Sequence, residues 1–179
     1  MSVVTARVYE DKIVMATDSI IAYGWTKTSP VVEKDGKKTR NFSKLIEVNG
    51  MLIGGVGSAE SIQLMQIFAT TVNKPKSSNE KDMLDFVVEF NKWKKDMPAI
   101  SIDPGDVEFL IAVDGELFYI GGLYIEHVMN YSAIGAGMDY ALAALYLGHS
   151  PAEAAKTACE LNCFVSEPVF ELTQERKKK

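Results

Sequence analysis

Residues 43–60 read SKLIEVNGMLIGGVGSAE and contain two apolar runs, a turn and the start of an amphipathic segment. Asn49-Gly50 separates the two apolar runs and is the strongest short signal for a β-hairpin. Gly54-Gly55-Val56-Gly57 then leads into a segment that Ser58 can cap as a helix. Because a hairpin joins antiparallel strands, this stretch predicts an antiparallel sheet that passes directly into a helix.

The flanking sequence adds strands and helices of the same kinds. Further strands are expected at Val3–Tyr9, Ile13–Ala16, Phe109–Val113, Glu116–Ile120 and Val169–Leu172. Helices are expected after Ser58, after Ser77 with Glu80 as a capping box, over Tyr140–Leu147, and after Ser150. The order lacks the strand–helix alternation of a parallel sheet. It predicts an α+β protein in which two antiparallel sheets face each other, with helix pairs outside.

Composition excludes several classes of protein. The chain has 179 residues, of which 47% are hydrophobic, and 19 basic residues against 24 acidic ones give a net charge of −5. We expect a single domain over residues 1–174, followed by a frayed basic tail over residues 175–179. An acidic chain is a poor match for nucleic acid. It has neither a membrane-length apolar run nor a recognisable export signal, which predicts no membrane partner and a cytoplasmic location.

The common catalytic and metal-binding motifs are missing. No P-loop, G-x-S-x-G or H-E-x-x-H pattern occurs, and the two histidines, His127 and His149, fall in no ligand spacing. Cys159 and Cys163 are expected to be small buried residues. We therefore expect no metal and no cofactor.

The start of the chain offers a different chemistry. Ser2 follows Met1, and a residue this small favours removal of the initiator methionine. Removal would give Ser2 both a hydroxyl and a free α-amine, whose pKa is normally about 7.7–8.0. That amine can act as the general base for its own hydroxyl.

Three further features occur in order along the chain. Asp18 ends the second strand, Lys44 opens a later strand, and the glycine-rich turn leads into a helix. With Ser2 at the start, this pattern resembles the proteasome β-subunit family, including the HslV-type proteases, among the N-terminal nucleophile hydrolases. The 16-residue step from Ser2 to Asp18 fits that family, and the longer 26-residue step to Lys44 is absorbed by a hairpin insertion at Thr26–Arg40.

The resemblance implies a four-layer αββα sandwich and a set of residue roles. Ser2 would be the nucleophile, in a threonine-peptidase-type site that uses serine. Lys44 would supply a buried positive charge, Asp18 would pair with it, and the Gly55 N–H would be an oxyanion donor. Phe42 and Ile53 would line an apolar substrate pocket, with plain core packing as their alternative.

The resemblance also implies partners. They are a peptide or unfolded-protein substrate, further copies of the chain in stacked rings, and an ATPase unfoldase. Two departures keep other functions open: Ala136 stands where the family commonly has serine, and residues 162–166 lack the usual acid. The alternatives are a catalytically silent ring subunit or shell protein and, more distantly, an amidohydrolase that acts on small amides.

Overall fold

The computed structural model describes residues 2–23, 26–28, 31–34, 37–40, 42–72, 74–96 and 107–176. The first strands are β1 (Val4–Val8), β2 (Lys12–Thr17), β3 (Ile21–Tyr23), β4 (Thr26–Thr28), β5 (Val31–Lys34), β6 (Lys37–Arg40), β7 (Leu45–Val48) and β8 (Met51–Val56). The later strands are β9 (Glu108–Val113), β10 (Glu116–Gly121), β11 (Tyr124–Val128), β12 (Tyr131–Ile134) and β13 (Phe170–Glu175). The helices are α1 (Ala59–Thr71), α2 (Glu80–Lys95), α3 (Met138–Tyr146) and α4 (Pro151–Leu161).

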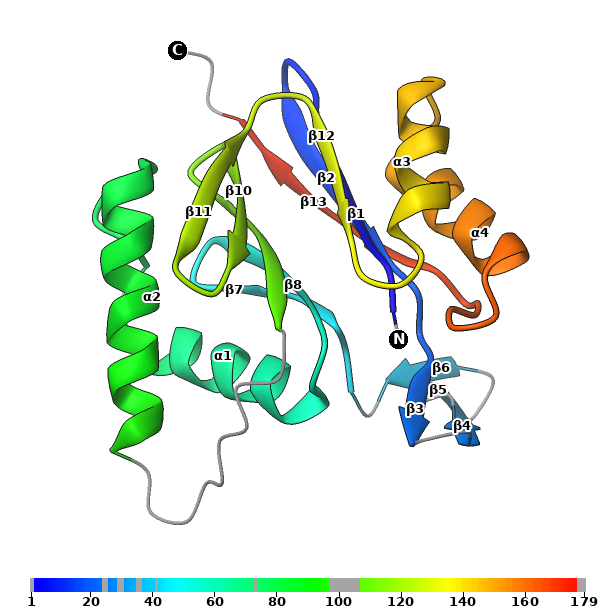
Figure 1. Ribbon diagram of the computed structural model, residues 1–179, viewed down its shortest axis with the longest axis horizontal. Helices are drawn as coiled ribbons and strands as arrows, with labels where there is room; N and C mark the ends of the chain where they lie inside the picture. The colour runs from blue at the N-terminus through cyan, green and yellow to red at the C-terminus, as the bar shows by residue number, and fades with distance from the viewer. Residues whose placement is uncertain are drawn as a thin grey trace.

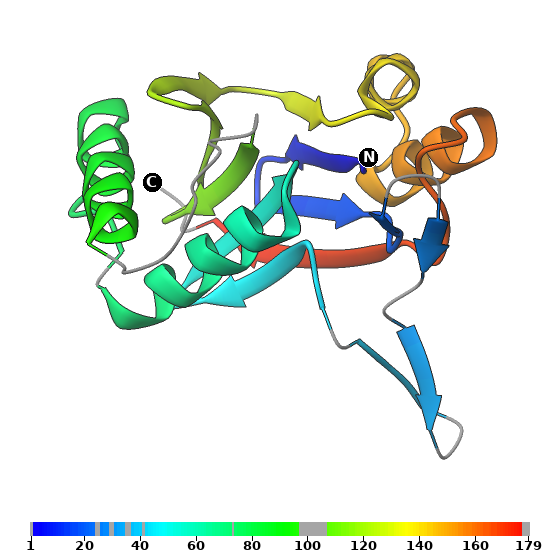
Figure 2. The same cartoon turned by 60° about the horizontal axis from the view of Figure 1, so that its bottom comes forward.

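Two antiparallel sheets form the centre of the molecule (Figure 1). One has the strand order β12-β1-β2-β13 and the other β11-β10-β9-β8-β7. Helices α1 and α2 cover the outer face of the second sheet, and α3 and α4 cover that of the first (Figure 2). The predicted α+β fold, a four-layer αββα sandwich, is therefore confirmed.

Each of the three layer contacts has its own apolar core. Strand β8 shows why, because successive side chains of a strand point to opposite faces. Met51 and Ile53 pack toward α1 and α2, whereas Leu52 and Val56 pack between the two sheets. The third core is rich in alanine and lies between the first sheet and α3 with α4.

The two predicted hairpin turns are present. Asn49 and Gly50 have φ values of 49° and 74°, and Asp114 and Gly115 have values of 50° and 83°. Positive φ at both central residues is typical of the tight turns that match the twist of paired strands. The strand pairs β7–β8 and β9–β10 follow from these two dipeptides.

Helix starts agree with the sequence except at α2. Ser58 caps α1, and Ser150 with Glu153 forms the capping box of α4. The cap of α2 is Asn79, whose side chain accepts a hydrogen bond from the Asp82 N–H, so the prediction of Ser77 is wrong. Ser77 instead donates from Oγ to the Asp82 carboxylate, at 2.5 Å.

Other segments differ from the sequence-based description. Strands β11 and β12 were not predicted as a pair of strands, and β13 runs to Glu175. Arg176 donates from its backbone N to Asp11 O (2.8 Å) and from Nη1 to Tyr9 O (2.9 Å), so the expected boundary at residue 174 falls too early. Residues 177–179 lie outside the described chain.

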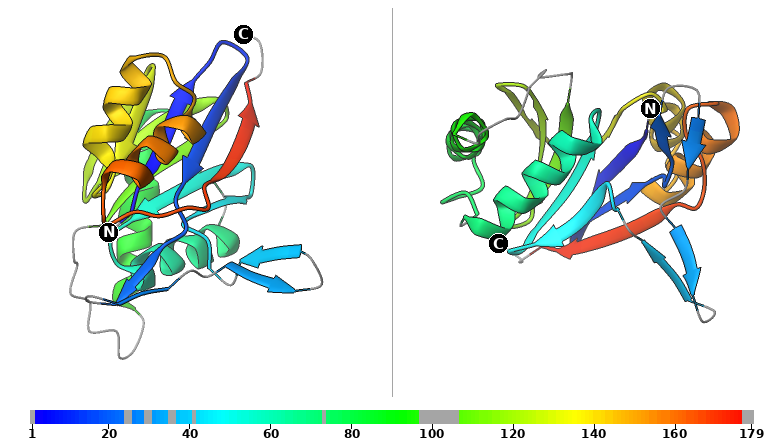
Figure 3. Two further views of the ribbon diagram at one scale, coloured as in Figure 1. Left: turned by 90° about the vertical axis from the view of Figure 1, so that its right-hand side faces the viewer. Right: turned by 90° about the horizontal axis from the view of Figure 1, so that it is seen from below.

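The insertion expected at Thr26–Arg40 contains β4, β5 and β6. Strand β4 pairs with β3, which precedes the insertion, and β5 pairs with β6. The β5–β6 ribbon projects away from the sandwich (Figure 3). Among the described helices, none is long and apolar enough to cross a bilayer.

Candidate active site

The beginning of the chain is held against the loop that precedes α3. Ser2 is only 3% exposed, and its carbonyl oxygen accepts a hydrogen bond from the Gly137 N–H at 3.2 Å. Gly135 has a φ of 92°, and a Cβ atom there would lie 2.4 Å from the Ser2 carbonyl oxygen. Glycine at position 135 is therefore required both for its backbone conformation and for the close approach of Ser2.

Asp18 joins the start of β1 to Lys44. Its Oδ1 atom accepts hydrogen bonds from the Val3 N–H at 2.9 Å and from Lys44 Nζ at 2.7 Å. Its Oδ2 atom accepts from the Ile20 N–H at 3.2 Å. The residue after Ser2 and the Lys44 ammonium therefore share one carboxylate oxygen, which brings the positive charge close to the N-terminal segment.

Lys44 precedes β7 and is buried, with 5% of its surface exposed. Burial lowers the pKa of Lys44 from its ordinary value of 10.5, while the charge of Asp18 and its hydrogen bond oppose that shift. A buried ammonium stays charged only where such a partner compensates for the lost hydration. The pair thus supplies a fixed positive charge beside the first residues of the chain.

Gly55 does not offer a free donor. Its backbone N–H donates to the Lys44 carbonyl oxygen at 2.9 Å, which continues the ladder that pairs Leu45 with Gly54. The assignment of the Gly55 N–H as an oxyanion donor is therefore corrected. What Gly55 does provide is space, because a Cβ atom there would come within 2.8 Å of the Phe109 ring.

The two residues expected to line a substrate pocket both pack in or against the core under α1 and α2. Ile53 is fully buried in the core under α1 and α2, so its alternative, core packing, is what the structure shows. Phe42 is half-buried and lines a cavity of about 10 Å³ together with Asp18 and Lys44. A cavity of this size holds no peptide side chain, so the described residues form no open apolar pocket at this point.

Residues of α4 and the segment after it complete the surroundings of the site. Asn162 donates from Nδ2 to the Ala136 carbonyl oxygen (2.6 Å), and the Ser166 carbonyl accepts from the Ser19 N–H (3.2 Å). The sequence pointed to residues 136 and 162–166 only through the missing hydroxyl and acid. In the structure, Asn162 and Ser166 instead make hydrogen bonds that involve the backbone of Ala136 and Ser19.

The cysteines are only partly as expected. Cys159 is half-buried, whereas Cys163 is exposed, which corrects the expectation that both are buried. Burial and the nearby negative charge of Asp18 raise the pKa of the Cys159 thiol to about 12. At neutral pH it is therefore a neutral thiol, not a nucleophile. The described residues contain no cluster of three potential metal ligands.

Comparison with known proteins gives structural matches only. No protein-family model and no curated protein matches the sequence. Thiobacillus denitrificans BPH in complex with epoxomicin has 20% identity and a TM-score of 0.81, over 98% of this chain and 100% of that chain. Eukaryotic HslV from Trypanosoma brucei has 18% identity and a TM-score of 0.69, over 97% and 99% of the two chains.

Anbu (ancestral beta-subunit) from Yersinia bercovieri has 13% identity and a TM-score of 0.65, over 97% of this chain and 81% of that one. Identities this low establish the fold and not the chemistry. The structures similar to this chain are thus of the HslV and proteasome type, and the chain has their αββα fold.

Proposed function

We propose that this chain is a peptidase whose nucleophile is Ser2 once Met1 has been removed. The observation that carries the proposal is the buried Asp18–Lys44 pair, with Nζ and Oδ1 2.7 Å apart and the same oxygen bonded to the Val3 N–H. Burying an ion pair costs hydration free energy, and the attraction between the two charges often does not exceed that cost. The Asp18–Lys44 pair is therefore weak evidence for a role in stability alone. Its place beside the first residues of the chain gives that charge a catalytic use.

The proposed reaction uses two groups of the same residue. The free α-amine of Ser2 accepts the Oγ proton while Oγ bonds to the substrate carbonyl carbon, and the carbonyl π electrons move to oxygen. When the carbonyl re-forms, the C–N bond breaks and the leaving amine takes the proton from the α-amine. Water then hydrolyses the ester by the same route and regenerates Ser2.

Lys44 and Asp18 act on this step through charge. The ammonium lowers the pKa of the nearby amine and hydroxyl and stabilises the negative charge that develops on Oγ. Asp18 keeps Lys44 protonated and holds it in one orientation. Both are charged groups already in place, so no reorganisation is needed during the reaction.

The oxyanion donor is assigned to Gly57 in place of Gly55. N–H groups two residues apart along a strand point to the same side, so the Gly57 N–H leaves β8 on the side that β7 no longer covers. Gly57 has a φ of 108° and is exposed. A Cβ atom built on Gly135 would lie 2.9 Å from Val56 Cγ1 and 2.4 Å from the Ser2 carbonyl oxygen, which supports a location of this strand end beside Ser2.

The substrate and assembly belong to the same proposal. Peptides or unfolded chains would reach Ser2 inside a ring-shaped compartment of stacked rings, fed by an ATPase unfoldase in the cytoplasm. Self-association is supported by large apolar side chains on the surface of α3 and just beyond it, including Tyr140, Tyr146 and Leu147. The αββα fold shared with HslV supports the same arrangement.

A catalytically silent ring subunit is the second candidate, and one observation favours it. Ala136 offers no hydroxyl to orient the α-amine of Ser2. In such a subunit the Asp18–Lys44 pair would have a structural role only. The two candidates differ in whether Ser2 can be acylated or alkylated.

Intact-mass measurement separates them. The purified protein is analysed before and after incubation with epoxomicin, the ligand named for the T. denitrificans BPH complex. We expect a chain that has lost Met1 and gains one adduct, which peptide mapping assigns to Ser2. Ser2→Ala should gain none, Ser2→Thr should keep or increase labelling, and Lys44→Ala should lose peptide cleavage while remaining assembled.

Thr5 is the matched control for the nucleophile. Its Oγ1 donates to the Pro151 carbonyl oxygen at 2.8 Å, and its nitrogen is an amide, so it lacks a base. An adduct on Thr5, or one that persists in Ser2→Ala, would refute the assignment of the nucleophile. A retained Met1 with no adduct in any variant would support the silent subunit.

A further inference from the structure

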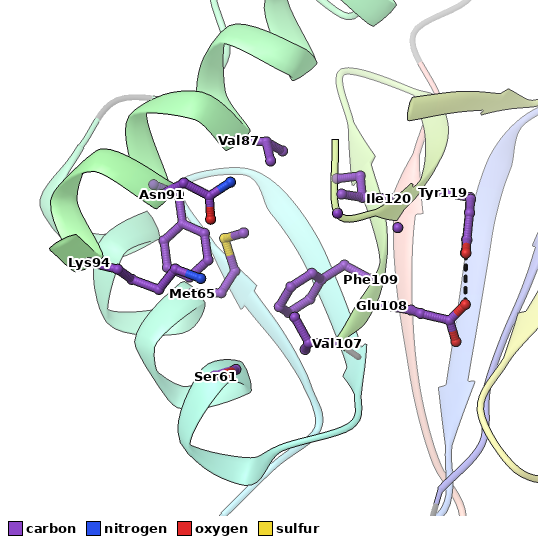
Figure 4. A pocket seen from close by; sticks show the side chains of 13 residues that line it. Ser61, Met65, Val87, Asn91, Lys94, Val107, Glu108, Phe109, Tyr119 and Ile120 are labelled. Carbon is purple, nitrogen blue, oxygen red and sulfur yellow. Dashed lines mark hydrogen bonds between the residues drawn. The ribbon is translucent and has the colours of Figure 1, made fainter. Parts of the chain in front are cut away.

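A large cavity lies away from Ser2, between the second sheet and its covering helices. It is bounded by α1, α2, β9 and β10 and has a volume of about 630 Å³ (Figure 4). Ligand sites in proteins usually measure about 300–1,000 Å³. Its apolar wall is formed by side chains of both helices and both strands, including Met65, Val87, Phe90, Phe109 and Ile120.

Lys94 is a cation at this apolar wall. Lys94, in the last turn of α2, is 8% exposed, and its ammonium lies 4.5 Å from the centre of the Phe90 ring. Figure 4 shows Lys94 Nζ beside Met65, on the cavity side of the helix. Burial lowers the pKa of Lys94 from its ordinary value of 10.5.

Within the described part of the chain, Lys94 makes no ion pair. Glu108 also lines the cavity, but its Oε1 accepts a hydrogen bond from the Tyr119 hydroxyl at 2.7 Å. Figure 4 shows this pair on the far side of Phe109 from Lys94. The contact with Phe90 and the end of the helix dipole offset part of the cost of burying Lys94, and neither supplies an opposite charge.

We propose that this cavity binds a monocarboxylate with an apolar chain, whose carboxylate pairs with Lys94. The apolar chain lies along Met65, Val87 and Phe109, and Asn91, which lines the cavity next to Lys94, donates a second hydrogen bond to the carboxylate. A neutral ligand would leave the ammonium unpaired, and a cationic one would add repulsion. The site is on the helix side of the second sheet, whereas Ser2 precedes β1 of the first sheet, so it is separate from the proposed peptidase site.

Trp93 provides a probe for binding. Its ring is 6.4 Å from that of Phe90, which lines the cavity. In a Trp25→Phe background it is the remaining tryptophan of the chain. Titration with decanoate should change the Trp93 emission saturably, whereas decanol at the same concentrations should bind about tenfold more weakly or not at all, since it lacks the charge.

Three variants test the role of the charge. Lys94→Met should weaken decanoate binding by about tenfold or more, and Lys94→Arg should keep most of it. Lys92→Met removes an exposed cation from the same last turn of α2 and should leave the dissociation constant unchanged. Equal binding by Lys94→Met and the parent protein, or no saturable binding by the parent, would overturn the proposal.

Thermal unfolding gives a second, independent measurement. Because Lys94 is a buried cation that no acid of the described residues pairs with, Lys94→Met should raise the Tm of the ligand-free protein. Decanoate should raise the Tm of the parent and not that of Lys94→Met. A fall in the Tm of ligand-free Lys94→Met would show that the chain itself already compensates the charge of Lys94, which would refute the proposal. Both measurements should be the same in Ser2→Ala, so they are independent of peptidase activity.

Discussion

Replacing Asp18 with asparagine removes the charge that faces Lys44 and keeps one oxygen that can accept a hydrogen bond. In the native protein the carboxylate accepts from Lys44 Nζ, the Val3 N–H and the Ile20 N–H. The variant leaves a buried ammonium without its counter-ion. Breaking such a pair from one side costs about 3–5 kcal/mol. In a chain of this length each kcal/mol lowers Tm by about 2–4 °C, so Asp18→Asn should lower Tm by about 6–20 °C.

A second substitution should recover part of the loss. Asp18→Asn/Lys44→Met replaces the unpaired ammonium with an apolar side chain of similar length, so its Tm should exceed that of Asp18→Asn alone. Asp85→Asn is the matched control, because Asp85 pairs with Lys81 at 2.9 Å on the exposed surface of α2. Its Tm should not change measurably. All variants are compared by calorimetry at one protein concentration, since self-association would shift Tm.

The pH dependence follows from the lowered pKa of Lys44. Between that value and about 10.5, the unfolded chain binds more protons at Lys44 than the folded chain, so stability rises with pH. Loss of Asp18 lowers the pKa of Lys44 further and widens this window. The deficit of Asp18→Asn against the double variant should therefore shrink as pH rises toward 10.5. A double variant that is no more stable than Asp18→Asn near neutral pH would refute the account of the pair.

Two further predictions concern the surroundings of the site. Gly135→Ala should abolish epoxomicin labelling and lower Tm, because the new Cβ atom would lie 2.4 Å from the Ser2 carbonyl oxygen. Gly50→Ala is the control: Gly50 also has a positive φ, but a Cβ atom there would have no neighbour within 4 Å, so labelling should be kept. Labelling by Gly135→Ala at the native rate would contradict this. Alkylation of the native protein with N-ethylmaleimide near pH 7 should add one equivalent, on exposed Cys163, since the pKa of Cys159 is about 12. Rapid modification of Cys159 under native conditions would be inconsistent with that environment.

Much of the fold follows from short local signals. The dipeptides Asn49-Gly50 and Asp114-Gly115 specify tight turns, and the Ser150 capping box specifies the start of α4. The start of α2 was predicted wrongly at Ser77, because Ser77 and Asn79 are both residue types that cap helices and the cap is Asn79. Strand β11 escaped prediction because its partly buried positions are Ile125 and His127, and the polar His127 breaks the apolar alternation expected of a strand.

One part of the candidate site was predicted before the structure, and another part depends on the register in which β7 pairs with β8. The pairing of Asp18 with Lys44 was implied by the resemblance to proteasome β-subunits, and the structure contains that ion pair. Which glycine N–H remains free depends on how β7 pairs with β8. Leu45 lies opposite Gly54, so Lys44 lies opposite Gly55 and its carbonyl oxygen accepts the hydrogen bond of the Gly55 N–H. The next N–H on the same side of the strand is that of Gly57, the oxyanion donor that we propose. No local signal in the sequence distinguishes these glycines, and a shift of one residue would reverse the faces of β8.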